Sequence, residues 1–211
     1  INSCQGSYSG CQPPDCYYVD PLSFNDTETG SSTSPYKTLK KAIELAESNR
    51  VIIGFTYDIN TNFVINETIT LKYNISISSY FENIPIKIDL TSSSAIQPPP
   101  NSRYALIFNF PNNKQLEINN CIIENLNKTY VTLFEMNSST LKLNKLVFQK
   151  IHQQIPVLTS QFYFVNGRSM KIEINNMILK DSGFGIQLIG SELIINNSLL
   201  LDCSMISNFL L

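Results

Sequence analysis

Two aspartates are the residues of this 211-residue chain whose type and spacing best suit a chemical role. Asp181 and Asp202 each stand at the tenth position of a repeated phrase. If the two copies stack on neighbouring strands, their carboxylates could share a cation such as calcium, which prefers oxygen ligands. Two carboxylates alone make a poor calcium site, and two exposed turn residues are the alternative. Apart from this calcium, the sequence indicates no cofactor.

Residues with catalytic chemistry are otherwise sparse. The one histidine, His152, falls in a predicted loop, although its pKa would permit proton transfer. The chain has no Asp-Asp pair, no glycine-rich phosphate loop and no Ser/His/Asp arrangement. Its net charge is −2 and its basic residues are scattered, which does not predict a nucleic-acid surface. The sequence therefore identifies no catalytic residue.

The elements that must position these residues follow from a phrase that recurs four times in the second half of the chain. Each copy reads apolar, any, apolar, Asn, polar, and a further apolar pair follows it. The copies are Leu116–Asn120, Leu141–Lys145, Ile172–Asn176 and Leu193–Asn197, and the intervals between their starts are unequal. Irregular repeats of roughly 20 to 30 residues are typical of a stacked, quasi-one-dimensional fold.

The fourth position of every copy is asparagine: Asn119, Asn144, Asn175 and Asn196. Stacked about 4.8 Å apart, these side chains would form a column in which each amide bonds to the next. A buried, fully satisfied column is stabilising, whereas each unpaired group would cost about 1–3 kcal/mol. Asn also tolerates the left-handed backbone conformation that a corner between two strands can require. We therefore expect a structural role for the column.

A third strand is predicted before each phrase. Residues 105–110, 131–137, 162–166 and 184–189 alternate so that one row points inward and one outward. The inward row is Phe108, Phe134, Phe164 and Ile186, and the outward row is Asn109, Glu135, Tyr163 and Gln187. Three strands per coil is the plan of a parallel β-helix. The outward row contains one carboxylate and no basic residue, which argues against acid–base catalysis there.

One helix is predicted to begin at Ser34. This residue is a good N-cap, and Pro35 suits the first helical position. An apolar stripe at helical spacing follows, made of Tyr36, Leu39, Ala42, Ile43 and Ala46. Because the end of a stacked sheet exposes unpaired backbone groups, we expect this helix to cap the first coil.

This part of the chain resembles the start of pectin-lyase-like right-handed β-helix proteins. The matching residues are Tyr18-Val19-Asp20-Pro21, Asn25-Asp26, Gly30 and Ser34-Pro35-Tyr36-Lys37-Thr38-Leu39-Lys40-Lys41-Ala42-Ile43. The resemblance covers most of residues 17–211 and implies an all-β solenoid, a right-handed parallel β-helix with an N-terminal capping α-helix. It does not imply one activity, because members include polysaccharide lyases, hydrolases, adhesins and catalytically silent surface proteins.

Enzymes with this resemblance would need charged groups that the outward row lacks. Lyases need acidic residues for calcium and a basic residue, and hydrolases need two or three aspartates. A leucine-rich repeat is the alternative fold, since Leu116-x-Ile118-x-x-Cys121 fits its strand phrase. Leu146 and Met177 then occupy the position that its Asn or Cys should fill.

The cysteines divide into two groups. Cys4, Cys11 and Cys16 crowd the first sixteen residues, which predicts a disulfide-tied segment rather than a zinc site, since no histidine is near. Cys121 and Cys203 would lie several coils apart, too far to bond, and we expect buried, unreactive thiols. The chain then divides into a Cys-rich segment (1–17), an initial strand with the capping helix (18–50), and β-helix coils (51–211).

Glycosylation sequons and the clustered cysteines favour a secreted or cell-surface protein. Sequons begin at Asn25, Asn66, Asn74, Asn127, Asn137 and Asn196. Asn127 and Asn137, in predicted turns, are the best glycosylation candidates, whereas Asn196 should be bare within the column. No apolar run reaches the ~20 residues of a membrane span. The apolar end Asn208–Leu211 predicts that further coils or another protein chain cover it.

The function predicted from these observations is a non-enzymatic, extracellular structural, adhesion or recognition module of a larger surface protein or assembly. One alternative is a carbohydrate-active enzyme, a polysaccharide lyase or glycoside hydrolase, whose site lies partly in coils outside this sequence. The other is a carbohydrate-binding module that uses Tyr163, with glycans as its ligands.

Overall fold

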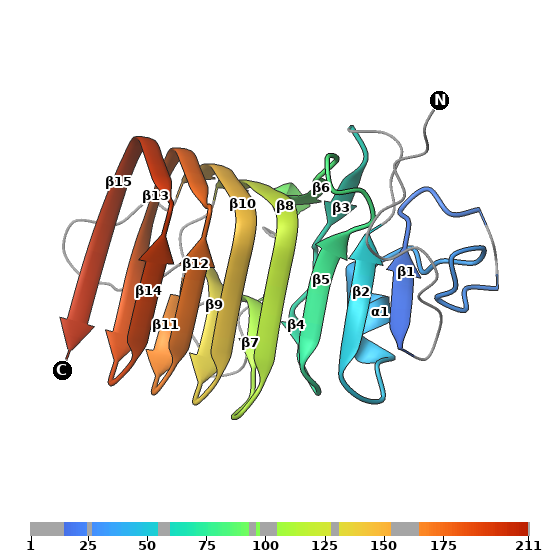
Figure 1. Cartoon of the computed structure of the whole chain (residues 1–211), viewed down its shortest axis with the longest axis horizontal. Coiled ribbons are helices and arrows are strands. Elements are labelled where there is room, and N and C mark those ends of the chain that lie inside the picture. Colours follow the sequence, from blue (N-terminus) through green and yellow to red (C-terminus); the bar gives the residue numbers. More distant parts are fainter. Residues whose placement is uncertain are drawn as a thin grey trace.

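The structure is a computed structural model that describes residues 15–24, 27–54, 60–92, 96–97, 105–127, 131–152 and 165–210. Within these residues the side chains of 105, 127, 131, 152, 183–188 and 202–210 are not described. The described chain is mostly parallel β-sheet with one short helix. Figure 1 shows the strands standing side by side along the long axis, from β1 near one end to β14 and β15 at the other.

The strands form three series, which we call the first, second and third faces. The first face contains β1 (Cys16–Val19), β2 (Arg50–Gly54), β5 (Ile75–Ser79), the beginnings of β8 (Gln115–Asn127) and β10 (Thr140–His152), then β12 (Lys171–Asn175) and β14 (Glu192–Asn196). Every pairing in this series is parallel. The copies of the repeated phrase therefore stack in register, with Leu116 beside Leu141 and Ile172 beside Leu193.

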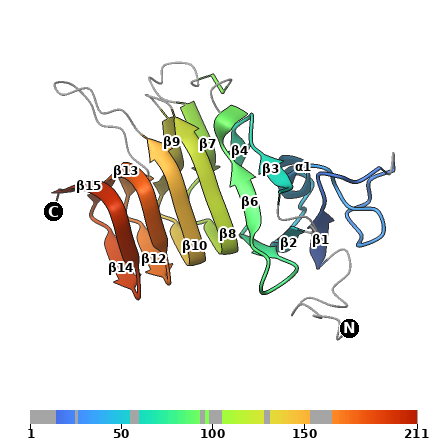
Figure 2. The ribbon, with the colours of Figure 1, turned by 90° about the horizontal axis from the view of Figure 1, so that it is seen from above.

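The second and third faces follow the same order. The second contains β3 (Asn62–Val64), β6 (Ile86–Asp89), the later parts of β8 and β10, and the beginnings of β13 (Ile178–Ile189) and β15 (Leu199–Leu210). The third contains β4 (Ile69–Thr70), β7 (Ala105–Phe110), β9 (Val131–Asn137), β11 (Val165–Arg168) and the ends of β13 and β15. Figure 2 shows the second-face strands in sequence order from above.

Left-handed residues separate the faces. The first corner holds Asn120, Lys145, Asn176 and Asn197, the second Asn125, Lys150 and Asp181, and the third Asn113, Ser138, Ser169 and Gly190. Their φ angles run from 43° to 65°. Asn, Asp and Gly adopt this conformation most readily. In three of the four copies the left-handed residue is the second asparagine of an Asn pair, and in the fourth it is Lys145. Each corner thus turns the chain with a single residue.

Residues 178–199 show one complete circuit. β13 begins on the second face, turns at Asp181 and crosses the third face to Ile189. Gly190 turns the chain into β14 on the first face, and Asn197 turns it again into β15. Leu199 then lies beside Ile178, where the circuit started, in a parallel pairing. This path is compatible with a parallel β-helix.

Inward side chains of successive circuits form the core. On the first face the inward positions Leu116, Leu141 and Ile172 are fully buried. On the third face Phe108 stacks on Phe134, with ring centroids 5.4 Å apart and planes inclined by 18°. Burial of such columns, about 1.5–3 kcal/mol per large side chain, supplies the main stabilising free energy.

The helix begins later than the sequence predicted. α1 spans Leu39–Glu44 with Thr38 as its N-cap, whose side chain accepts a hydrogen bond from the Lys41 N–H at 3.1 Å. Ser34 is not the cap, because Tyr36 instead pairs with β1: its N–H donates to Tyr18 O at 2.9 Å and its carbonyl accepts from Asp20 N–H at 2.8 Å. The predicted apolar stripe is nevertheless buried, and α1 packs against β1, β2 and β4.

The third strand of one repeat is also displaced from its predicted position. β11 begins at Val165, which lies beside Phe134 and Ile186, and Asn166 lies beside Glu135 and Gln187. Val165 and Asn166 therefore hold the inward and outward places predicted for Phe164 and Tyr163, which lie outside the described residues. Three strand segments in each circuit, with no α-helix in the described residues after Glu44, disfavour the leucine-rich-repeat alternative.

Candidate functional site on the first face

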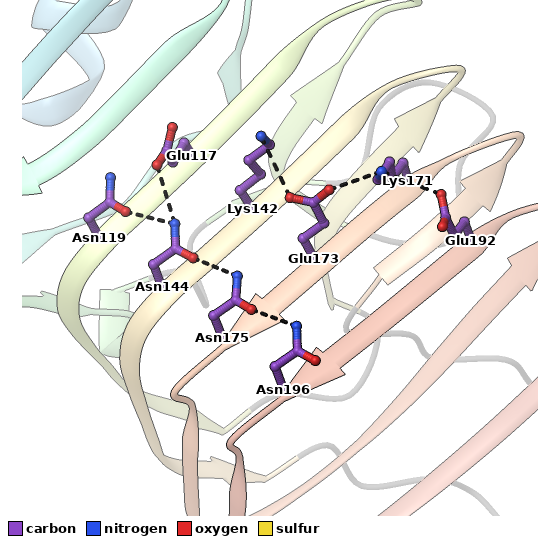
Figure 3. A network of polar contacts seen from close by, with 9 residues as sticks. All are labelled: Glu117, Asn119, Lys142, Asn144, Lys171, Glu173, Asn175, Glu192 and Asn196. Atoms are coloured by element: carbon purple, nitrogen blue, oxygen red, sulfur yellow. Dashed lines mark hydrogen bonds and ion pairs between the residues drawn. The ribbon is translucent and has the colours of Figure 1, made fainter.

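The four repeat asparagines form a continuous chain of side-chain hydrogen bonds (Figure 3). Asn144 Nδ2 donates to Asn119 Oδ1, Asn175 Nδ2 to Asn144 Oδ1, and Asn196 Nδ2 to Asn175 Oδ1, each at 2.9 Å. Asn119 Nδ2 in turn donates to Ser76 Oγ at 3.3 Å, which links the column to β5 at the register position of Glu117. The equal distances follow from the strand register, because each partner sits at the same height on its strand.

The asparagine column lies on the outer side of the first face. The inward residues of the first face are the alternate positions, such as Leu116 and Ile118, so the asparagines point outward. Asn119, Asn144 and Asn175 are partly buried and Asn196 is exposed. The column is therefore a feature of the outer surface, shielded by its own neighbours rather than by the core.

Charged side chains form a second row beside the asparagines. Glu117, Lys142 and Glu173 occupy one register position on successive strands, so the sign of charge alternates along the stack. Lys142 Nζ lies 3.6 Å from Glu173 Oε2, and Glu117 Oε1 accepts a hydrogen bond from Asn144 Nδ2 at 3.2 Å. Figure 3 shows two separate sets of contacts: Glu117 is bonded to the asparagine column, whereas Lys142 and Glu173 belong to a chain of ion pairs beside it.

The chain of ion pairs continues at the edge of the face. Lys171 Nζ lies 3.0 Å from Glu173 Oε1 and 3.6 Å from Glu192 Oε2. The bond to Glu173 raises the pKa of Lys171, and the same bond lowers the pKa of Glu173. Both groups are solvent-accessible, where water and salt screen such pairs. Their main consequence is that the carboxylates of this face are matched by lysines or amides.

Serines beside the corners form a further set of contacts, which the sequence interpretation missed. Ser139, Ser182, Ser191 and Ser198 each directly follow a left-handed residue. Each hydroxyl donates to a carbonyl two residues earlier and accepts a backbone N–H from the preceding circuit. A corner turns backbone groups away from the sheet ladder, and these hydroxyls satisfy them. Their recurrence after the corner residues was the available sequence signal.

A polar cavity of about 240 Å³, the corner notch, opens where the first face meets the first corner. The lining residues are Ser78, Ser79, Glu82, Asn119, Asn120, Asn144, Lys145 and Asn176. It exists because β5 ends at Ser79 and residues 80–85 form a loop before β6, while the later strands continue into the corner. Asn120 fixes this loop, since its Nδ2 donates to Phe81 O and Glu82 O, both at 3.0 Å.

The other faces contain two carboxylates with displaced pKa values. Burial alone would raise the pKa of Asp89, but hydrogen bonds from Thr91, Asn125 and Asn62 outweigh it and lower the pKa. Burial raises the pKa of Glu135, although a 2.9 Å hydrogen bond from Asn166 opposes the rise. A carboxylic acid with a raised pKa is suited to proton donation, so Glu135 is the described residue closest to a catalytic type.

The predicted calcium ligands lie side by side in the backbone register. Residues Lys180 and Ser182 pair with Leu201 and Cys203, which places Asp181 next to Asp202. Asp181 is exposed and occupies a left-handed corner, and the side chain of Asp202 is not described. No group of three or more metal-type ligands occurs among the described side chains. Asp181 is accounted for as a corner residue, and calcium binding stays a prediction.

The remaining predicted residues fall into described and undescribed positions. Cys16 is fully buried and disulfide-bonded, while Cys4 and Cys11 lie outside the described residues, so their pairing stays a prediction. Cys121 is a free, fully buried thiol, and burial raises its pKa. The side chains of Cys203 and His152 are not described.

The sequons differ in how accessible their amides are. Asn66 and Asn137 are exposed. Asn74 is also exposed, and its Oδ1 accepts the Gln115 N–H at 2.9 Å, whereas the Nδ2 of Asn196 donates a hydrogen bond within the column. The side chain of Asn127 is not described, and Asn25 lies outside the described residues.

No family model, curated protein or solved structure matches this chain. The part of the chain that the structure describes contains no helix long and apolar enough to cross a membrane.

Proposed function

We propose that the protein is a right-handed parallel β-helix of the pectin-lyase-like type. The parallel pairing on three faces and the complete circuit from Ile178 to Leu199 support this architecture. The hand is inferred from the strong preference of parallel crossover connections, about 98% of which are right-handed. The strand at Cys16–Val19 followed by the helix at Leu39–Glu44 fits the order of elements in the resemblance.

For its function, we propose a non-enzymatic, extracellular structural or recognition module. One observation carries the proposal: the polar groups on the first face are bonded to one another. Each inner asparagine both donates and accepts within the column, and Glu173 is held by two lysines. A catalytic carboxylate must instead be free to exchange a proton with a substrate. A surface of this kind is suited to holding neighbouring strands together and to presenting a rigid face to a partner.

The test is a turnover assay with the whole chain. The purified protein is incubated with acidic and neutral polysaccharides, and both new reducing ends and unsaturated sugar products are measured. We expect neither product above a heat-denatured control. Formation of either product, abolished by a substitution of a single surface carboxylate, would overturn the proposal.

A carbohydrate-active enzyme is the second candidate, and Glu135 is the observation that favours it. Its pKa is raised, as a general acid requires, and it faces outward on the third face between Asn109 and Asn166. Glycoside hydrolysis ordinarily needs a second carboxylate about 5–10 Å away. If turnover is found, Glu135→Gln should abolish it, with Glu117→Gln as the control on the first face.

Secretion is proposed on separate grounds. The disulfide at Cys16 requires an oxidising compartment, and exposed Asn66 and Asn137 each begin a sequon. Peptide mapping of protein secreted from eukaryotic cells should find glycans at Asn66 and Asn137. It should find Asn196 bare, because the amide nitrogen that a glycan would join donates a hydrogen bond to Asn175.

A further inference from the structure

We propose that the corner notch is a binding site for one ring of a neutral, hydroxyl-rich ligand, that is, an uncharged sugar residue. The inference rests on the recognition part of the proposed function and names the ligand class. The lining of the corner notch combines hydrogen-bond donors and acceptors, and the volume of the notch is about 240 Å³. Sites that enclose drug-sized ligands measure roughly 300–1,000 Å³, so this cavity suits a single ring.

Several hydrogen-bonding groups of the notch are already used by the fold. Both amide hydrogens of Asn120 are taken by the loop carbonyls of Phe81 and Glu82. Asn144 donates to Glu117 and Asn119 and accepts from Asn175. These groups hold the floor of the notch rigid, so that it is formed before any ligand arrives. Such preorganisation lowers the entropic cost of binding.

Other groups of the lining have no partner in the fold. The Glu82 carboxylate and the Lys145 ammonium make no ion pair, and the Asn176 amide makes no side-chain hydrogen bond, among the described residues. All three are exposed. Together with Oδ1 of Asn120, they offer both donors and acceptors at the rim of the notch.

The mixture of charges decides the class of ligand. A ligand with a single charge would be attracted to one of Glu82 and Lys145 and repelled by the other. Each hydroxyl of a sugar donates one hydrogen bond and accepts two, so an uncharged polyol can satisfy both groups at once. Hydrogen bonds to charged partners are the stronger kind, which would make these two residues the largest contributors.

The notch is suited to binding rather than to cleavage. Glu82 is the one carboxylate in its described lining, and glycosidic bond hydrolysis ordinarily uses two. The inference is therefore consistent with a non-enzymatic module, but it can fail independently. Absence of binding would remove the site and leave the turnover result unaffected, whereas turnover would remove the proposed function and leave the binding result unaffected.

The experiment titrates the whole ¹⁵N-labelled protein with neutral methyl glycosides of hexoses and N-acetylhexosamines. Side-chain amide signals of Asn120, Asn144 and Asn176 are followed by NMR, and glucuronate and glucosamine serve as charged probes. We expect at least one neutral glycoside to shift these signals saturably and more tightly than either charged probe. Absence of shifts with every neutral glycoside, or preference for a charged probe, would overturn the proposal.

Two variants and two matched controls locate the site. Glu82→Gln and Lys145→Asn should each weaken binding about tenfold, which is the loss of one charge-assisted hydrogen bond. Asn is chosen at position 145 because it tolerates the left-handed backbone there. Lys150→Asn is the control, since Lys150 is also exposed and left-handed but lies on the second corner. Glu47→Gln is the control for the exposed carboxylate. Equal affinity in all four variants would place the ligand elsewhere and overturn the proposal.

Discussion

Replacing Asn144 by alanine removes the centre of the asparagine column. The side chain makes three hydrogen bonds, to Asn119 and Asn175 at 2.9 Å and to Glu117 at 3.2 Å. Each is worth about 0.5–1.5 kcal/mol net, and water replaces part of this at a partly buried site. We therefore expect a loss of about 2 kcal/mol in the free energy of unfolding. Asn196→Ala, which removes one exposed hydrogen bond, should cost at most about 0.5 kcal/mol.

The measurement is urea unfolding of both variants, with the midpoint and the slope fitted separately. An unchanged slope shows that stability rather than compactness has changed. Asn144→Asp extends the test, because its carboxylate would face the acceptor oxygens of Asn119 and Glu117. It should cost more than alanine at pH 7 and recover as the pH falls and the new carboxyl regains a proton. Asn176→Asp, on the exposed corner outside the column, is the control for added charge. Equal losses from Asn144→Ala and Asn196→Ala would refute the reasoning.

Four further predictions concern backbone, pH and reactivity. Gly167→Ala should destabilise by about 3 kcal/mol in urea unfolding, because a Cβ there would lie 1.6 Å from Met136 O, whereas Gly190→Ala, with open space around it, should cost only about 1 kcal/mol. Asp89 has a lowered folded pKa, so its contribution is present above its unfolded value of ~3.9 and lost as the pH falls through the folded pKa; Asp89→Asn should flatten the acid limb of stability measured against pH. Glu135 has a raised folded pKa, so its ionisation opposes folding above that value; Glu135→Gln should stabilise at pH 7 and have no effect well below the unfolded value of ~4.3. Cys121 should resist alkylation in the native protein and react after unfolding, as peptide-level mass spectrometry would detect.

The repeated phrase by itself determines the first face. Its alternation placed Leu116 and Ile118 on one side and fixed which asparagines would share a register. Period-2 patterns and Asn pairs are local signals, so they can be read from sequence. The left-handed corners at Asn120, Asn176 and Asn197 belong to the same local category.

The two wrong predictions, the start of the helix and the register of one third-face strand, concern segments whose structure depends on pairing with residues distant in sequence. Pro35 and Ser34 have the propensities of a helix start, but pairing of Tyr36 with β1 outweighed them and moved the helix to Leu39. The third strand at Val165 was misplaced because its register is set by β9 on the preceding circuit and β13 on the following one. Propensity is a weak prior wherever tertiary pairing is available.

The sequence by itself determined that strands would stack and that the repeat asparagines would meet. Only the tertiary structure decided that this outward column is partly buried, because its burial depends on the side chains that neighbouring strands bring beside it. It also decided that Glu82, in the loop after β5, and Lys145, at the first corner and distant in sequence, line the same notch. This contact depends on the long insertion between β5 and β8, which nevertheless pair on the first face, and on the pitch of each circuit. Neither can be read from a short segment of the sequence.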